Sequence, residues 1–500
     1  MLAKLLIKFE LYKKIAYLCR KQHYSKLIRP MKQFILQFVI LLASCLTAWA
    51  GDYDKYYEQL PTEVAQVTLP SIPSNEVSIT DFGAIGDGIA LNTYAFRNAI
   101  NRLTEQGGGK VIVPAGVWLT GPIELKDNIE LHLEKNALIY FAPDKRLYLG
   151  HSDRQERVLP CIYAMHRTNI AITGEGTIDG NGNQWRPVRR NKMSDVEWKQ
   201  YLSLGGTVTD DGALWYPWKM KNHYPDIAEK AKDYESIRND LIRLYGCTNI
   251  LIKGITAQNS PRFHVHPINS RNVIIDGNTV RCPWNAQNGD GIDLSDVNVA
   301  LVVNNSVDVG DDGICMKSSV AKKNIPANGC EDIIIQDNSV YHAHGGFVLG
   351  SNTTSGIRRM VVRHNRFIGT DTGLRFKSGI GRAGKTERIF ISDIVMSDIV
   401  KEAIVFQCDY SDHNADWSPK RSTNLTEKQQ KRIPDFQDIH ISNIVCRGCK
   451  TAIKAKGLPD LQCVHDITID NATITYRKNA NQIDDATTDI KLTNVRLVKE

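Results

Sequence analysis

Three aspartates stand out from acidic residues that are otherwise scattered along the chain. Asp290 and Asp311 are 21 residues apart, and Asp312 follows directly. One structural repeat of that length would place them about 4.8 Å apart, the spacing of adjacent strands. Carboxylates this close raise the pKa of at least one of them, and a protonated acid beside an ionised base is the pair that hydrolyses glycosidic bonds. A calcium site, or turns built from Asp-Gly pairs, would use the same residues.

Basic side chains follow on the next repeats. His344 comes first, in His342-Ala-His344, and the segment Gly373-Leu-Arg375-Phe-Lys377 comes after it. Arg375 and Lys377 are two residues apart, so on a strand both side chains point to the same side. Two cations beside an acidic cluster indicate an anionic substrate, because an arginine fork binds a carboxylate well. A buried ion-pair network with the aspartates is the alternative.

A repeated theme must position these residues. From about residue 249, a short β-branched run, a small polar residue and another short run recur along the chain. The aligned ends fall at 255, 278, 305, 338, 365, 394, 444, 472 and 495. Repeats of this size without intervening helices indicate a solenoid, in which each coil buries its face against its neighbours. We therefore predict an all-β protein built as a parallel β-helix, since a β-sandwich predicts no fixed period.

Three segments lie outside the repeat. Residues 92–103 have apolar residues at helical spacing and end at Gly107, which predicts a helix that caps the first coil. Residues 184–239 form an irregular insertion that is rich in Trp and Tyr. Its rings suit stacking on sugars or packing the insertion as a wall across the groove, and we favour the wall. A polar loop over 412–435 explains the one step of 50 residues.

The beginning of the chain resembles a targeting signal. Residues 31–50 contain a basic head, a short apolar stretch and Ala48-Trp49-Ala50, which together predict a secretory signal peptide cleaved near Ala50. The segment Leu42-Ala43-Ser44-Cys45 also resembles a lipoprotein signal, with Cys45 as the lipidated residue. Residues 1–30 read as an upstream extension and 51–76 as a linker. We expect an extracytoplasmic protein, secreted, periplasmic or surface-anchored, with no membrane span, because no apolar run is long enough.

Charge and cysteine content exclude other classes of protein. Residues 1–50 hold nine of the 62 Lys and Arg residues but one of the 55 acidic residues, so residues 51–500 have a net charge of −1. A nearly neutral body gives no electrostatic basis for nucleic-acid binding. Nine scattered cysteines remain after Cys19 and Cys45, which allows one or two disulfides but no disulfide framework. Cys446-x-x-Cys449 lacks a second pair, so we expect no metal site.

At this point the chain resembles glycoside hydrolase family 28, the polygalacturonases. Four motifs carry the resemblance in order: Asn288–Asp290, Gly310–Asp312, His344–Gly345 and Arg375–Lys377. The family patterns are Asn-Thr-Asp, Gly-Asp-Asp, Gly-His-Gly and Arg-Ile-Lys, and the chain differs from them at Gly289, Ala343 and Phe376. The segment Ile404–Tyr410 also resembles a family segment that ends in a substrate-binding tyrosine, and the resemblance runs from Val77 to Val498.

The resemblance implies a right-handed parallel β-helix over 77–500 that hydrolyses α-1,4 bonds between galacturonates in pectin. It implies that Asp311 is the general acid and that Asp290 and Asp312 hold and deprotonate water, while His344 tunes the acid. The sugar-binding residues it implies are Arg375, Lys377 and Tyr410. The family inverts the anomeric centre and needs no cofactor. We expect a monomer, and His344-Gly-Gly346 is similar to the bacterial exo-acting branch.

The sequence is also compatible with other activities. Within the family, endo-polygalacturonases and rhamnogalacturonan or xylogalacturonan hydrolases share the fold. Rhamnogalacturonan hydrolases generally lack the histidine and the Arg-x-Lys pair, which favours a galacturonan substrate here. A calcium-dependent pectate lyase is the rival enzyme class, since it uses the same solenoid. A solenoid that only binds glycan is the non-enzymatic alternative, and the intact set of Asp290, Asp311, Asp312 and His344 argues against it.

Overall fold

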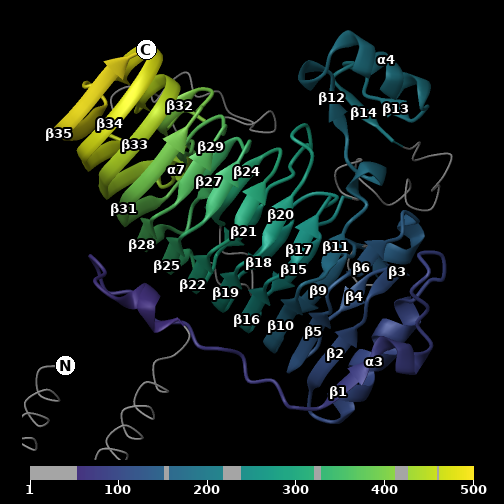
Figure 1. The fold of residues 1–500 in the computed structure, drawn as a ribbon. Helices are drawn as coiled ribbons and strands as arrows, with labels where there is room; N and C mark the ends of the chain where they lie inside the picture. Colours follow the sequence, from purple (N-terminus) through teal and green to yellow (C-terminus); the bar gives the residue numbers. More distant parts are fainter. Residues whose placement is uncertain (1–52, 151–156, 218–237, 320–327, 411–425, 459–460) are drawn as a thin grey trace, which may run out of the picture. The chain divides into compact units, whose positions relative to one another are not determined.

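The computed structural model describes residues 53–150, 157–217, 238–319, 328–410, 426–458 and 461–500 (Figure 1). The predicted extension, signal peptide and lipidation site therefore lie outside the described residues. The chain divides into two compact units, Met1–Glu58 and Gln59–Glu500. In the first unit, the described residues form the short 3-10 helix η1 (Asp54–Tyr57). The second unit holds the repeats and the candidate site.

Parallel strands of the second unit stack in three columns, because successive coils of the chain contribute corresponding strands (Figure 1). The first stack contains β1 (Glu76–Ser78), β2 (Gly109–Val113), β5 (Ile129–Leu133), β10 (Thr168–Gly174), β16 (Thr248–Lys253), β19 (Arg271–Asp276), β22 (Asn298–Val303), β25 (Cys330–Gln336), β28 (Ile357–Arg363), β31 (Lys385–Ser397), β33 (Asp435–Lys456), β34 (Val464–Ile483) and β35 (Thr488–Lys499). The second stack contains β3 (Gly116–Thr120), β6 (Ala137–Phe141), β11 (Thr177–Asp179), β17 (Thr256–Gln258), β20 (Thr279–Arg281), β23 (Ser306–Asp308), β26 (Ser339–Tyr341), β29 (Arg366–Ile368) and the end of β31.

The third stack carries the candidate site. It contains β4 (Ile123–Glu124), β9 (Ile162–Met165), β15 (Ile242–Tyr245), β18 (Val265–Ile268), β21 (Ile292–Ser295), β24 (Asp312–Ser318), β27 (Gly345–Thr353), β30 (Leu374–Lys377), β32 (Glu402–Gln407) and the end of β33. A two-stranded pair, β7 (Leu149–Gly150) and β8 (Arg157–Val158), and the 3-10 helices η2 (Ile79–Phe82), η3 (Lys145–Tyr148) and η4 (Gly182–Gln184) lie outside the stacks. The predicted right-handed parallel β-helix is confirmed.

The core runs along the axis of the helix. In β16, Ile250 and Ile252 are fully buried, and they pair in register with Val273 and Ile275 of β19. Alternate residues of a strand point to opposite faces, so each coil presents one apolar face to the interior. A single strand of this length cannot bury that face alone, and the stacking of neighbouring coils makes the hydrophobic core continuous.

A ladder of buried asparagines follows the repeat positions found in the sequence. Asn278, Asn305, Asn338 and Asn365 stack in that order, and the side-chain oxygen of each of the last three accepts hydrogen bonds from the backbone and side-chain amides of the preceding one at 2.9–3.0 Å. Each side-chain amide of these four also donates to a buried backbone carbonyl. Because buried polar groups cost stability unless they are paired, the ladder fixes the register of the coils between β16 and β31.

The predicted capping helix is present as α3 (Thr93–Glu105). Its buried face consists of Ala95, Phe96, Ala99, Ile100 and Leu103, at the spacing of one helical face. This face packs against β1, β2, β4 and β5, the first strands of the solenoid (Figure 1). The helix therefore covers the apolar interior of the first coils, which would otherwise face solvent.

The insertion over 184–239 is more regular than its sequence indicates. Residues 218–237 are outside the described part, but the rest forms an antiparallel sheet of β12 (Val188–Arg189), β14 (Leu214–Tyr216) and β13 (Thr207–Val208), with η5 (Arg190–Lys192) and α4 (Asp195–Ser203). The expectation of an irregular stretch is therefore wrong for these residues. Two-residue strands carry too little periodicity to be read from sequence. Helix α4 and strands β12, β13 and β14 project beyond the third stack (Figure 1).

Two tryptophans of the insertion, Trp185 and Trp215, are buried in packing contacts. Trp185 is fully buried, meets the ring of Tyr148 edge-on at 4.9 Å and lies 4.2 Å from the ammonium of Lys145. Trp215 is also buried, against Tyr201 at 5.0 Å. These contacts agree with the expected wall rather than with rings exposed for sugar stacking.

The structure also bears on the predicted loop, the predicted linker, the cysteines and the expected absence of a membrane span. Residues 412–425 of the predicted loop lie outside the described residues, and a single helical turn, α7 (Glu427–Gln430), lies in the remainder. Within the segment predicted as a linker, Thr68 exchanges hydrogen bonds of 2.8 Å with Asn272 of the solenoid. All nine described cysteines are buried free thiols. No helix within the described residues is long and apolar enough to cross a membrane.

Candidate active site

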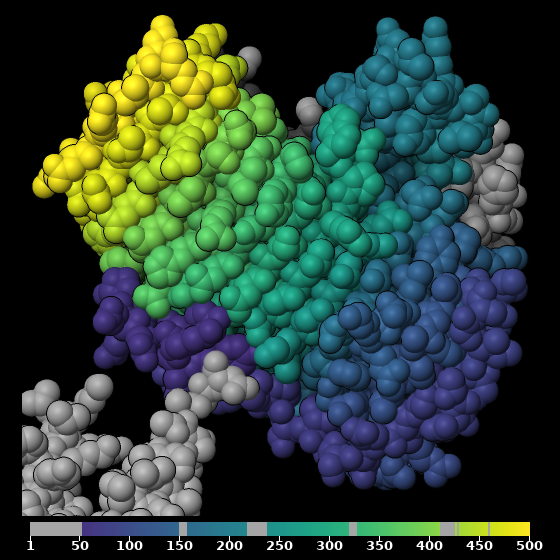
Figure 2. All heavy atoms as spheres, in the orientation of Figure 1, coloured from purple at the N-terminus to yellow at the C-terminus, as the bar shows by residue number. Residues whose placement is uncertain are grey.

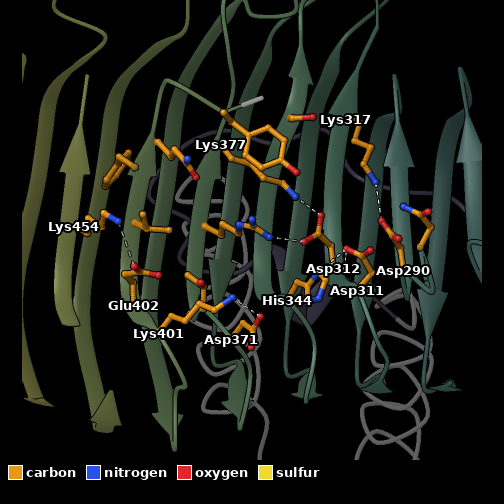
Figure 3. A pocket seen from close by; sticks show the side chains of 18 of the residues that line it. Asp290, Asp311, Asp312, Lys317, His344, Asp371, Lys377, Lys401, Glu402 and Lys454 are labelled. Carbon is orange, nitrogen blue, oxygen red and sulfur yellow. Dashed lines mark hydrogen bonds and ion pairs between the residues drawn. The ribbon is translucent and has the colours of Figure 1, made fainter. Parts of the chain in front are cut away.

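A groove of about 850 Å³ runs across the third stack, and it contains every predicted site residue. One of its sides is formed by Arg189, Asn191 and Lys192 of the insertion, and the other extends to Lys454 and Lys456 of β33. In the space-filling view the surface is hollowed between the insertion and the C-terminal coils (Figure 2). Strand register places side chains of successive coils side by side along the groove floor (Figure 3).

The three aspartates meet at the centre of this groove. One carboxylate oxygen from each of Asp290, Asp311 and Asp312 lies within 4.8 Å of the others. Asp290 precedes β21 and Asp312 begins β24, and the two coils are joined there by a hydrogen bond from Gly291 N–H to Asp312 O at 2.9 Å. At Gly310, an added Cβ would meet the carbonyl oxygens of Pro283 and Trp284 at 2.7 Å, so only glycine allows this close approach.

Cations from two strands, β24 and β30, surround the carboxylates. Lys377 Nζ lies 2.6 Å and Arg375 Nη1 3.2 Å from the carboxylate of Asp312. Lys317 Nζ lies 3.0 Å from Asp290 and 2.5 Å from Asp293. The ion-pair network considered as an alternative for Arg375 and Lys377 is therefore present in the free protein. Both side chains also line the groove, so the pairing and a contact with substrate are compatible.

The three carboxyl groups differ in their affinity for a proton. Burial raises the pKa of Asp290 well above its usual range, and the negative charges of Asp293, Asp311 and Asp312 raise it further against the opposing charge of Lys317. Burial also raises the pKa of Asp312, but Lys377 and Arg375 outweigh burial, and the net pKa is lowered. The expected elevation of one pKa is thus confirmed, and it falls on Asp290.

Asp311 is held in its charged form by its neighbours. Burial alone would raise its pKa, but the hydrogen bond from His344 and the charges of His344, Lys377 and Lys192 lower it below its usual range. His344 Nδ1 lies 3.0 Å from Asp311 Oδ1, and the backbone N–H of His344 donates to Asp311 O at 2.8 Å. Of the three carboxyl groups, Asp290 is thus the one whose pKa is raised, while the pKa values of Asp311 and Asp312 are lowered.

His344 has a second polar neighbour, which comes from the insertion. Lys192 Nζ lies 3.2 Å from His344 Nε2 and 3.3 Å from Gly310 O. An ammonium group can only donate, so His344 accepts at Nε2 and donates from Nδ1 to Asp311. Burial lowers the pKa of Lys192.

Tyr410 closes the same part of the groove. Its ring lies 5.3 Å from Lys377 Nζ and 5.8 Å from the guanidinium of Arg375. Its backbone N–H donates to Ser378 O at 3.1 Å, which ties the residue to the end of β30. All seven residues predicted for the site are therefore brought together in one groove: Asp290, Asp311, Asp312, His344, Arg375, Lys377 and Tyr410.

Comparison with known proteins identifies the family. Residues 199–494 match the model of glycosyl hydrolases family 28. The chain belongs to this family. It is 26% identical over 489 residues to a probable polygalacturonase of Vitis vinifera, which covers 94% of this chain and 89% of that protein. It is 28% identical over 410 residues to an exo-poly-alpha-D-galacturonosidase of Dickeya chrysanthemi, which covers 78% of this chain and 65% of that enzyme.

Solved structures agree with this assignment to family 28. The hyperthermoactive exopolygalacturonase of Thermotoga maritima superimposes with a TM-score of 0.68 at 30% identity, over 87% of this chain and 94% of that one. The family 28 exopolygalacturonase of Yersinia enterocolitica superimposes with a TM-score of 0.60 at 22% identity, over 85% of this chain and 78% of that chain. The latter likeness concerns the fold. This chain is thus a family 28 glycoside hydrolase.

Two lysines of this family 28 site were missed in the sequence. Lys317 lies on β24 and its ammonium also lies 4.5 Å from the ring of Phe263. Lys317 alternates with the buried apolar residues Ile314 and Met316 of the same strand, which places it on the outer face, a signal that strand periodicity could have supplied. Lys192 could not have been found this way, because it lies in the insertion, 152 residues before His344.

A metal ion does not fit the donor set of this site. The three aspartates would be a candidate cluster by distance alone. However, ammonium and guanidinium groups already contact Asp290 and Asp312 at 2.6–3.2 Å. These cations occupy the directions in which a divalent cation would bind and would repel it. His264 and His266 are also committed to protein partners, since His264 Nδ1 lies 2.8 Å from Asp290 O and His266 Nδ1 lies 2.7 Å from Asp240.

Proposed function

We propose that the protein hydrolyses α-1,4 bonds between galacturonates of polygalacturonate, acting from a chain end and inverting the anomeric centre. The observation that carries this proposal is the groove itself, where three carboxylates lie within reach of one another beside Arg375 and Lys377. The carboxylates suit cleavage of a glycosidic bond, and the cations suit a sugar that carries a carboxylate. The named activities of the relatives support the same substrate.

Asp311 is proposed as the general acid, although it is ionised in the free protein. A galacturonate carboxylate that pairs with Lys377 weakens the hold of that cation on Asp311, and a sugar that excludes water adds to its desolvation. Both effects raise the pKa of Asp311. The proton then passes from Asp290 to Asp311, and the ionised Asp290 gains the full attraction of Lys317 at 3.0 Å. Asp311 then protonates the leaving glycosidic oxygen.

Asp290 and Asp312 are proposed to hold and deprotonate the attacking water. Asp312 is ionised because Lys377 and Arg375 lower its pKa. Asp290 Oδ1 is buried and has no hydrogen-bond partner among the described residues, so it is available to water. Once the proton has moved to Asp311, two ionised carboxylates face the water. No cofactor is needed, because protonation of the leaving group and activation of water require only carboxyl groups.

The exo mode is proposed from the position of the insertion. Lys192 reaches His344 at 3.2 Å, so the insertion walls the groove immediately beside the catalytic cluster. On the other side the groove continues past β32 to β33. A polymer chain can enter such a groove with one end against the wall while the remainder leaves over the C-terminal coils. The product would be a monomer or a short fixed oligomer.

The hydrolase proposal is tested with polygalacturonate and the purified protein. Hydrolysis releases reducing ends without an unsaturated uronide, and a chelator leaves the rate unchanged. Ultraviolet absorbance of an unsaturated product, lost when calcium is removed, would instead establish a lyase. Binding of oligogalacturonate without any cleavage would establish the glycan-binding alternative.

The stereochemical proposal needs a separate measurement. The short distance among the carboxylates would by itself favour retention, because retaining enzymes hold their two groups closer than inverting ones, whereas membership of family 28 favours inversion. Proton NMR of the first product formed decides between them. Initial appearance of the β-anomer from the α-linked substrate means inversion, and initial appearance of the α-anomer contradicts the proposal.

A further inference from the structure

The groove contains a second pair of cations in the same register as the first. Arg375 of β30 pairs with Val405 of β32, which pairs with Lys454 of β33. Lys377 of β30 likewise aligns through Gln407 with Lys456 of β33. The motif Arg375-x-Lys377 therefore recurs two rungs further along the same face as Lys454-x-Lys456. Two rungs correspond to about 10 Å along the axis of the solenoid.

Both lysines of the second pair line the groove, on its open side. The view along the groove floor shows Lys454 with Glu402, beyond Lys377 and away from Lys317 (Figure 3). The intervening Val405 and Gln407 carry no charge and also line the groove. A bound chain that extends from the catalytic cluster toward the C-terminal coils must therefore pass Lys454 and Lys456.

The two cation pairs differ in their exposure and in the strength of their ion pairs within the protein. Lys377 has a side chain only 7% exposed and is bound to buried Asp312 at 2.6 Å. The side chains of Lys454 and Lys456 are 45% and 58% exposed, and their partners Glu402 and Asp409 lie at 3.7 and 3.5 Å. Long, solvated ion pairs are weak. Lys454 and Lys456 can therefore exchange these partners for a carboxylate of the substrate at little cost.

We propose that Lys454 and Lys456 form an outer subsite that binds the carboxylate of a further galacturonate, two rungs from the one bound by Arg375 and Lys377. This inference rests on the proposed function and adds a preference for chain length to it. The contact is out of reach of a dimer bound across Asp311. It therefore contributes to binding only when the chain extends beyond the dimer.

The test uses the double variant Lys454→Gln/Lys456→Gln and unesterified galacturonate oligomers of increasing length. The measured quantity is the ratio of kcat/KM for a tetramer or pentamer to kcat/KM for the dimer. Loss of a charge-assisted contact lowers this ratio by about 10-fold or more relative to the unaltered protein. Methyl-esterified oligomers of the same length, which lack the carboxylate charge, show a much smaller decrease.

Lys450→Gln is the matched control, since Lys450 is an exposed lysine of the same strand that does not line the groove. It leaves the ratio unchanged. Equal losses for dimer and longer oligomers in the double variant, or no loss for either, would overturn the outer subsite. An unaltered protein that cleaves no galacturonate oligomer at all would overturn the proposed function instead, so the two failures are distinguishable.

Discussion

At the scale of single residues, the charge on each carboxylate is set by the cation beside it. Asp312 stays ionised because Lys377 lies 2.6 Å and Arg375 3.2 Å away. The pKa of Asp290 is raised by burial and by the charges of Asp293, Asp311 and Asp312, in spite of Lys317, which also contacts Asp293 at 2.5 Å. Three chemically identical side chains within a few ångströms thus have pKa values shifted in different directions, as acid–base catalysis requires.

Replacement of Lys377 tests this charge control through the pH profile. In Lys377→Met, the cation that lowers the pKa of Asp312 is absent, so that pKa rises. The ionised form exists above the pKa, and the acid limb of kcat/KM therefore moves to higher pH. Binding of unesterified galacturonate oligomers also weakens by about 1.5–3 kcal/mol. An unmoved acid limb, measured on polygalacturonate across the acidic range, contradicts the assignment of Asp312 as base.

Asp311→Asn removes the proposed acid and little else. The side chain faces the groove and its partner His344 is partly exposed, so the thermal midpoint should change little. Turnover of polygalacturonate falls by at least about 100-fold, the usual contribution of a general acid. Near-normal turnover in this variant means that another carboxyl group protonates the leaving oxygen.

His264 links the stability of the protein to pH. Its ring is fully buried, Nε2 accepts from Ser260 N–H at 3.2 Å and Nδ1 lies 2.8 Å from Asp290 O. Burial lowers its pKa to about 4, whereas the unfolded chain binds the proton near pH 6.5. The stability that the neutral ring provides is therefore present above about pH 6.5 and is lost as the pH falls toward 4.

The consequence is measurable by urea unfolding at pH 7 and pH 5. His264 should account for about 2 kcal/mol of the stability lost between these two values. The variant His264→Gln is less stable at pH 7 but loses less on acidification. Exposed His342→Gln serves as the control and keeps the slope of the unaltered protein. An identical pH dependence in His264→Gln rules out this residue as the source.

Site residues on consecutive coils could be predicted from the sequence, whereas those that depend on distant parts of the chain could not. Asp290, Asp311, Asp312 and the Arg375–Lys377 pair lie on consecutive coils, where spacing along the chain translates directly into spacing along the axis. Lys192 reaches His344 from a separate element, and no local pattern encodes that approach. The raised pKa of Asp290 was also out of reach, because it depends on burial and on the charges that surround this carboxyl group in the folded chain.

At the scale of secondary-structure elements, the insertion decides how the groove is entered. The sheet of β12, β13 and β14 packs through buried Trp215 against Tyr201 of α4, and Lys192 of η5 reaches His344 of the coils at 3.2 Å. A wall fixed in this way blocks one direction of the groove permanently. The expected result on polygalacturonate is a steady rise in reducing ends while viscosity barely falls. An early collapse of viscosity with a ladder of intermediate oligomers would falsify the exo mode.

The asparagine ladder supports a second prediction at this scale. Asn305→Ala deprives Asn278 of its acceptor and removes the donor to Ile275 O and Val303 O. Buried groups left without partners cost about 1–3 kcal/mol each, so the free energy of unfolding falls by at least about 2 kcal/mol. Thermal unfolding measures the loss. Asn98→Ala, at an exposed position of α3, is the control and changes stability little.

Elements differ in how well the sequence predicts them. Positions 278, 305, 338 and 365 of the repeat coincide with the ladder, because an inward polar residue recurs once in each coil. Helix α3 was predicted within two residues, since its five buried side chains repeat at helical spacing. Strands β12 and β13 were not predicted, because two residues cannot display an alternation, and the pairing of β12 with β14 is also nonlocal.

At the scale of the whole molecule, the coils behave as a one-dimensional array. Each coil contacts its neighbours in sequence order, so opening begins at an end and progresses inward. The first coils are covered by α3, whereas β35 is the last strand of the first stack and has a partner on one side, β34. Partial opening on heating is therefore expected to start from the C-terminal coils.

The order of the coils then sets the order in which properties disappear. β33, with Lys454 and Lys456, stands two strands from that open end, and the strand that begins at Asp312 stands several coils further in. Warming would first erase the discrimination between long and short oligomers and only later the cleavage itself. The enzyme would lose its preference for long oligomers before it loses activity, because the coils that carry the two properties lie at different distances from the open end.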